Sequence, residues 1–225
     1  MSVAPVQVSA PTAENLPVLG FWKDGDSFVP TLAVAEAWTS PLFESLQNSG
    51  LFPAQKGEML TVPPCNDWSK GFVLLHLGNR SERTPESVGA LVRTTVTKLR
   101  KIPSLLFEAA DWFGDDRETS ARLFAQNVVR ALAPKVNYKK DAEAPQCPKV
   151  LLLSETDESK ALAEGTAIGA AIVTMCRLAD TPANLCTPAF LCEEARNIAK
   201  NHEKVFATIL EKPELEALGM GGLLG

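Results

Sequence analysis

The sequence lacks the residue clusters that most hydrolases and nucleotide-binding enzymes use. Only two histidines occur in 225 residues, His76 and His202, and no HExxH motif is present to bind zinc on a helix. A GxSxG nucleophile elbow and a GxxxxGKS/T phosphate loop are also absent. The glycine-rich run 219–222 follows a predicted helix instead of a strand, so it is not a dinucleotide fingerprint. The motif search therefore identifies no catalytic, no metal-binding and no cofactor-binding residue.

Basic clusters, long apolar runs and paired cysteines are scarce as well. The net charge is −5 and the longest basic runs are pairs such as Lys139-Lys140, which argues against tight binding to a nucleic-acid backbone. The low-charge stretch 165–176 is too short to span a membrane. The five cysteines form no CxxC pair, and residues 1–17 lack the pattern of a secretory signal. We therefore predict a cytoplasmic protein with free thiols and with neither nucleic-acid nor membrane partners.

The first two thirds of the sequence alternate between strand and helix patterns. Residues 1–15 are predicted to be a flexible tail, and residues 16–158 to form the first domain. Its continuously apolar run from Phe72 to Leu75 indicates a central parallel strand covered on both faces. A mostly parallel α/β sheet with helices on both faces is expected. Strands are predicted at 16–22, 58–62, 71–77, 104–107 and 149–153, and helices at 32–47 with an interruption at Pro41, at 85–99 and at 117–132.

The pattern changes after residue 158. Residues 159–180 are predicted to form a linker helix, whose many small residues allow other backbones to approach closely. Residues 181–225 are expected to begin a second α/β domain, with a helix from 188 to 201 that buries Leu191, Ala195 and Ile198, a strand at 205–210 and a short helix at 213–218. Because one strand and two helices cannot bury their own apolar faces, this second domain is expected to be incomplete.

The histidines and two of the cysteines have ordinary structural interpretations. His76 falls on the buried strand and is interpreted as a core histidine. His202 lies near a helix C-terminus, where a partial positive charge is favourable. Cys186 and Cys192 flank a helix start, but further metal ligands are lacking, so they are predicted to be buried thiols.

The acidic pairs and one loop complete the candidates. The carboxylates of 115–116 and 193–194 are predicted to complement helix N-termini. Residues 78–81 follow the central parallel strand, and ligands often bind at the carboxyl ends of such strands. This loop is the one place where the sequence suggests a ligand site, although no second glycine-rich loop supports it.

One segment resembles a known family. Residues 177–188, RLADTPANLCTP, are similar to the start of the catalytic domain in leucyl (cytosol) aminopeptidases. That start typically reads Arg, a short apolar pair, a polar residue, then Pro, one residue, Asn and a Thr-Pro helix start. Residues 211–225 are similar to the strand, short helix and Gly-Met-Gly loop that lead into the catalytic half. Residues 72–78 and 161–175 are similar to the central strand of the N-terminal domain and to the linker helix, and Asp180 stands where many members have Asn.

The resemblance implies a macro-domain-like N-terminal domain and a catalytic domain with two divalent metal ions, Mn or Zn. The metals would be held by Lys, Asp and Glu and would activate the water that attacks the peptide carbonyl. It also implies hexamers that release N-terminal amino acids, with Leu preferred, from peptides. None of the family's ligand motifs occurs in residues 1–225, so this chain is expected to bind no metal and to be inactive alone.

Two other interpretations stay open from the sequence. The chain could be a separate macro-like module that binds ADP-ribose or another nucleotide, because similar folds serve different functions. It could also be a non-catalytic partner subunit that joins a full-length aminopeptidase through the linker helix. The leading interpretation is the structural and oligomer-forming portion of a leucyl aminopeptidase.

Overall fold

The computed structural model describes residues 4–10, 12, 14–31, 41–65, 70–109, 111–134 and 146–224. The chain divides into two compact units, Met1–Cys176 and Arg177–Gly225. The division lies within α5 (Ser159–Asp180), the helix that the sequence analysis predicted as the linker.

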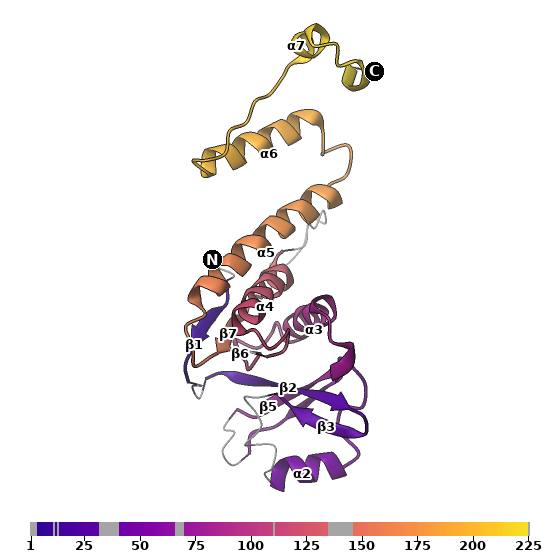
Figure 1. Ribbon diagram of the computed structural model, residues 1–225, viewed down its shortest axis with the longest axis vertical. Helices are drawn as coiled ribbons and strands as arrows, with labels where there is room; N and C mark the ends of the chain where they lie inside the picture. The colour runs from indigo at the N-terminus through magenta and orange to yellow at the C-terminus, as the bar shows by residue number, and fades with distance from the viewer. Residues whose placement is uncertain are drawn as a thin grey trace. The chain divides into compact units, whose positions relative to one another are not determined.

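The first unit is built on a seven-stranded sheet (Figure 1). Its order is β1-β7-β6-β2-β5-β4, and β3 pairs with β2 outside this path. The pairs β1·β7, β7·β6, β6·β2 and β2·β5 are parallel, whereas β4 and β3 join as antiparallel strands. The mostly parallel sheet predicted from the sequence is therefore confirmed. The strands are β1 (Val6–Val8), β2 (Leu16–Asp24), β3 (Ser27–Pro30), β4 (Met59–Val62), β5 (Phe72–Asn79), β6 (Ser104–Phe107) and β7 (Lys149–Leu153).

Helices cover both faces of this sheet, and each face has its own apolar core. Figure 1 shows α2 (Pro41–Asn48) on the opposite side of the sheet from α3 (Pro85–Lys98) and α4 (Arg117–Leu132). In β5, Val73 and Leu75 face the α3 and α4 core, while Phe72 and Leu74 face the core that contains Phe43 of α2. Burial on both faces explains the continuously apolar run in the sequence, since each such side chain contributes about 1.5–3 kcal/mol.

The helix starts follow from capping residues. The Thr84 hydroxyl accepts a hydrogen bond from the Ser87 N–H, and the Ser87 hydroxyl accepts one from the Thr84 N–H, so α3 begins with a capping box and Pro85 in its first turn. Asp116 caps α4 through hydrogen bonds from the N–H groups of Glu118 and Thr119. The bounds of α4, β6 and β7 agree with the sequence predictions.

The predicted flexible tail over 1–15 is wrong for Val6–Val8, which form β1 and pair with β7 at the sheet edge. A three-residue strand leaves almost no periodic signal in a sequence, and this one depends on the exposed edge of β7 for its hydrogen bonds. The part of the predicted helix at 32–40 lies outside the described residues, and α2 begins at Pro41, where an interruption was expected.

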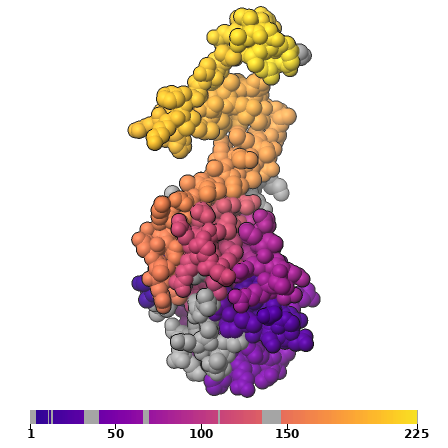
Figure 2. All heavy atoms as spheres, in the orientation of Figure 1, coloured from indigo at the N-terminus to yellow at the C-terminus, as the bar shows by residue number. Residues whose placement is uncertain are grey.

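Helix α5 packs tightly on α4 within the first unit. The buried residues Gly165 and Gly169 face the backbone carbonyls of Arg122 and Gln126, and Figure 2 shows the atoms of α4 and of the first half of α5 in continuous contact. The small residues of the predicted linker helix are thus used for close approach. Among the described residues, α5 is also the one helix long and apolar enough to cross a membrane, a property shared by helices of soluble proteins.

The second unit consists of α6 (Pro188–Asn201), α7 (Lys212–Ala217) and α8 (Gly221–Leu224) after the end of α5. Residues 205–210 form no strand, so that prediction is wrong: an extended segment becomes a strand only beside a partner edge, and the described residues of this unit supply none. Leu191 and Ile198 were predicted to be buried, but both are more than 40% exposed, and α6 has no buried residue. Gly219, with φ +68°, ends α7 in the left-handed conformation, as its place in the sequence suggested.

Candidate functional site

A pocket of about 310 Å³ lies at the carboxyl ends of the central parallel strands. Its apolar wall consists of Trp22 on β2 together with Val29 and Pro30 on β3. Strand β6 pairs with the first residues of β2, and β3 pairs with its last residues. The chain that follows β6 therefore lies near β3 at this end of the sheet. Its charged lining is made of Arg80, Asp111, Asp115 and Arg117.

Arg80 comes from the loop that the sequence analysis singled out at 78–81. The strand β5 continues through Gly78 to Asn79, and Arg80 then begins a short 3-10 helix, η2 (Arg80–Glu82). Gly78 has φ +99°, a conformation that other residues rarely adopt, and a Cβ there would come within 2.8 Å of the Lys56 side chain. The structure thus places one residue of the predicted loop, Arg80, in the pocket lining.

Arg83 is not part of the pocket lining, but it contacts three residues that are. Its guanidinium donates a hydrogen bond to the backbone carbonyl of Asp111 over 3.3 Å and lies 3.6 Å from the carboxylate of Asp115. It also lies 6.0 Å from the centre of the Trp22 ring. The Asp115 carboxylate is largely exposed, so the ion pair itself adds little stability. Arg83 instead connects η2, β2 and the segment before α4.

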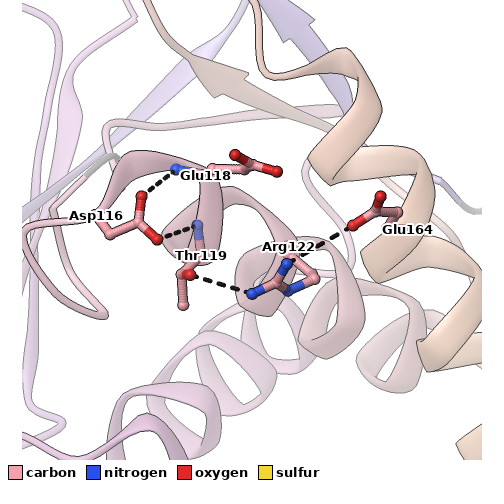
Figure 3. Close-up of polar contacts among 5 residues, drawn as sticks. All are labelled: Asp116, Glu118, Thr119, Arg122 and Glu164. Carbon is pink, nitrogen blue, oxygen red and sulfur yellow. Dashed lines mark hydrogen bonds and ion pairs between the residues drawn. The ribbon is translucent and has the colours of Figure 1, made fainter.

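The start of α4 completes this edge of the sheet. Figure 3 shows Asp116 accepting hydrogen bonds from the N–H groups of Glu118 and Thr119, while the Thr119 hydroxyl accepts one from Arg122. Hydrogen bonding from Thr119, led by its side chain, lowers the pKa of the Asp116 carboxyl. Arg122 in turn pairs with Glu164 of α5 at 3.7 Å. Arg117, the first residue of α4, is therefore held at the pocket by a fixed helix terminus.

Two buried ionisable groups lie outside the pocket lining. Glu108 follows β6 and is 8% exposed; burial raises the pKa of its carboxyl to about 7, and its Oε2 has no hydrogen-bond partner. His76 on β5 is 2% exposed and stacks on Phe21 at 4.9 Å, and burial lowers the pKa of its imidazole. Neither ring nitrogen of His76 has a hydrogen-bond partner. His76 is therefore a core residue, but its polar atoms are not satisfied.

The remaining candidates of the sequence analysis do not form a site. His202 is the exposed C-cap of α6, as predicted from its position near a helix end. Cys186 and Cys192 are half-buried thiols without a disulfide, so they are less buried than predicted. Over the described ranges, no three side chains of His, Cys, Asp or Glu are placed to hold a metal ion.

The acidic pairs differ in their roles. Asp116 caps a helix N-terminus as predicted. Glu193 and Glu194 do not lie at the start of α6, which is capped by Thr187. Glu193 pairs instead with Arg196, and Glu194 with Arg177 at 2.5 Å. The second of these pairs ties α6 to the end of α5 within the second unit.

Besides Val29 and Pro30 of β3, sequence reasoning missed three residues of the pocket: Trp22, Asp111 and Arg117. They are separated by about ninety positions along the chain and meet only because β2 lies between β5 and β6 in the sheet. The available signal was positional, since each lies at or just after the carboxyl end of a predicted strand or at the start of the helix that follows.

Comparison with known proteins identifies relatives over most of the chain. No family model matches. A probable cytosol aminopeptidase of Thermosynechococcus vestitus is 30% identical over 82% of this chain and 38% of its own length. A tomato leucine aminopeptidase mutant has a similar fold, with a TM-score of 0.74 and 16% identity over 97% of this chain and 46% of that one. The bottromycin maturation enzyme BotP in complex with Mn has a TM-score of 0.59 and 21% identity over 84% of this chain and 37% of that one.

The chain spans less than half the length of the curated relatives that it matches. The matches nevertheless cover most of this chain, in a bacterial and a plant relative alike, and the same family was indicated by residues 177–188. The fold of the tomato enzyme agrees with that of the chain over almost its full length. The chain therefore belongs to the leucyl (cytosol) aminopeptidase family.

Proposed function

We propose that this chain is the structural and oligomer-forming portion of a metal-dependent leucyl aminopeptidase, which releases N-terminal amino acids, with Leu preferred, from peptides. The observation that carries the proposal is the match to cytosol aminopeptidases over 82% of the chain but only 38% of the relative's length. In this proposal the catalytic residues belong to the part of the family's length that the chain does not span.

The proposed metals are two divalent ions, Mn or Zn. One protein with a similar fold is described in complex with Mn, which supports a divalent metal in proteins of this architecture. The residues present do not fit such a site, because the described part of the chain brings together no three His, Cys, Asp or Glu side chains. We therefore assign no step of peptide hydrolysis to residues of this chain.

An activity assay tests whether the catalytic residues lie outside this chain. The purified chain is incubated with leucyl p-nitroanilide and either Mn²⁺ or Zn²⁺, in parallel with the complete protein isolated from its source cells. We expect turnover by the complete protein only. Turnover by the chain alone would contradict the proposal, and so would a complete protein that is inactive with both metals.

Oligomer formation and location are the other parts of the proposal. We propose a hexamer in the cytoplasm; the relatives are named cytosol aminopeptidases, and the family resemblance supports the hexamer. Light scattering coupled to size-exclusion chromatography measures the mass of the complete protein, and a monomer would refute the hexamer. A calorimetric titration of the chain with ADP-ribose is expected to give no heat, which separates this proposal from a nucleotide-binding module.

A further inference from the structure

The pocket at the carboxyl edge of the sheet contains two cations that the protein leaves unused. Among the described residues, Arg80 and Arg117 form no side-chain hydrogen bond and no ion pair, although both line the pocket. Arg83 differs, because the Asp111 carbonyl and the Asp115 carboxylate already engage its guanidinium. Two guanidinium groups directed at one cavity can bind a carboxylate or phosphate with several charge-assisted hydrogen bonds.

The other lining groups restrict the anion. Asp111 and Asp115 place two carboxylates in the same lining, so the charges of the pocket balance and a phosphate dianion would meet repulsion. A ligand that carries a cation beside its carboxylate places an opposite charge next to the arginines and next to the carboxylates. Trp22, Val29 and Pro30 add an apolar wall, and the Trp22 ring is 2% exposed and held by Arg83.

The size of the pocket agrees with a small ligand. About 310 Å³ is at the lower limit of the volumes that small-molecule sites usually have. The position agrees as well, because ligands of open α/β sheets bind outside the carboxyl ends of the strands. An inorganic anion would leave the apolar wall unused, and a dinucleotide would exceed the volume.

We infer that this pocket binds a zwitterionic amino acid with an apolar side chain. Arg80 and Arg117 bind its α-carboxylate, Asp111 faces its ammonium group, and Trp22 contacts its side chain. The identification of this ligand as the product released by the enzyme rests on the proposed function, whereas the binding itself does not. The site lies wholly in the first unit, and in this proposal it binds amino acids without transforming them.

Calorimetry on the purified 225-residue chain tests the inference with four probes: L-leucine, N-acetyl-L-leucine, L-leucinamide and inorganic phosphate. The acetyl compound lacks the ammonium group and the amide lacks the carboxylate. We expect saturable binding of L-leucine in the millimolar range or tighter, and at least about tenfold weaker binding of the other three, as the loss of one charged hydrogen-bonding group predicts. If N-acetyl-L-leucine or phosphate binds as tightly as L-leucine, the claim that the ligand is a zwitterion is wrong. If L-leucine gives no heat, the claim that the pocket binds an amino acid is wrong.

Variants locate the binding. Arg80→Gln and Arg117→Gln are each expected to weaken L-leucine binding on the order of tenfold. Arg196→Gln, an exposed arginine of the second unit, is the matched control and should bind like the parent chain. Circular dichroism checks that every variant is folded. Unchanged binding in both pocket variants would overturn the assignment, and because no turnover is measured, that outcome would leave the proposed aminopeptidase function intact.

Discussion

Gly165 of α5 lies directly against the backbone carbonyl of Arg122 in α4. A Cβ at position 165 would come within 2.0 Å of that carbonyl oxygen, a distance that real contacts do not reach. One turn further, a Cβ at Gly169 would come within 2.8 Å of the Gln126 carbonyl. The absence of a side chain at these two positions therefore sets how closely the two helices approach, and Arg122 and Glu164 pair beside the contact.

Gly165→Ala is expected to destabilise the first unit. Alanine in a helix interior would normally gain about 0.5–1 kcal/mol over glycine, but here the obstacle is backbone, which cannot move aside without separating α4 from α5. We expect a net loss of about 1–3 kcal/mol in the free energy of unfolding. Urea unfolding followed by circular dichroism measures it. Gly114→Ala is the control, because a Cβ at position 114 would meet no other atom within 4 Å. An equal loss of stability in both variants would contradict the packing argument.

The regular elements of the first unit could be read from local sequence. Thr84 followed by Pro85 indicates the start of α3, and the bounds of α4 agree with its apolar periodicity. Three strands were wrong: Val6–Val8 and Ser27–Pro30 form strands that were not predicted, and residues 205–210 form none although one was expected. Val6–Val8 become a strand because β7 offers them an edge, and residues 205–210 do not, because the described residues of the second unit offer none.

The candidate site was predictable only in part, for a related reason. Arg80 follows the apolar run of β5, so a general rule about parallel strands pointed to it. Trp22 and Asp111 reach the same pocket through the strand order, which places β2 between β5 and β6. That order depends on crossovers that no local pattern records. The charge balance of the pocket likewise appears only when the residues are brought together.

Glu108 should make the chain less stable as the pH rises. Burial raises the pKa of its carboxyl from 4.5 to about 7, so the folded state holds this proton more tightly than the unfolded state does. The contribution is fully present below pH 4.5 and is lost as the pH rises through 7, with a total of about 3 kcal/mol. Glu108→Gln removes the titration and keeps the shape of the side chain. We expect the variant to be the more stable protein at pH 8.

The measurement is urea unfolding of the parent chain and of Glu108→Gln at pH 5 and pH 8. Glu86→Gln, at an exposed position in the first turn of α3, is the control and should follow the parent chain at both values. If Glu108→Gln keeps the same pH dependence as the parent chain, the carboxyl is not the group that titrates.

His76 acts in the opposite direction. Burial lowers the pKa of its imidazole below 6.5, so the folded state resists protonation that the unfolded state accepts. Its contribution is fully present above pH 6.5 and is lost as the pH falls below that value. Between pH 4.5 and 6.5, His76 therefore changes the free energy of unfolding with pH in the opposite direction to Glu108. His76→Phe keeps an aromatic ring on Phe21 and sacrifices no hydrogen bond, because neither nitrogen has a partner.

When the pH falls from 7.5 to 5.5, we expect the free energy of unfolding to change more favourably in His76→Phe than in the parent chain, because only the parent chain carries the opposing contribution of His76. The comparison is made by urea unfolding at the two pH values, with the exposed His202→Gln as the control for loss of a histidine. The same change in His76→Phe as in the parent chain would show that His76 does not contribute to the pH dependence.

Gln7 ties the N-terminal strand to the start of α5. Its side-chain amide donates a hydrogen bond to the Thr156 carbonyl over 2.5 Å, and its side-chain oxygen accepts one from the Glu158 N–H over 2.7 Å. Gln7→Ala leaves both backbone groups without this partner, and Glu158 is a buried residue. We therefore expect a loss of about 1–2 kcal/mol in the free energy of unfolding and faster hydrogen exchange at the Glu158 amide. Gln47→Ala on α2 is the control; an unchanged Gln7→Ala protein would mean that these two hydrogen bonds add nothing to the stability of the first unit.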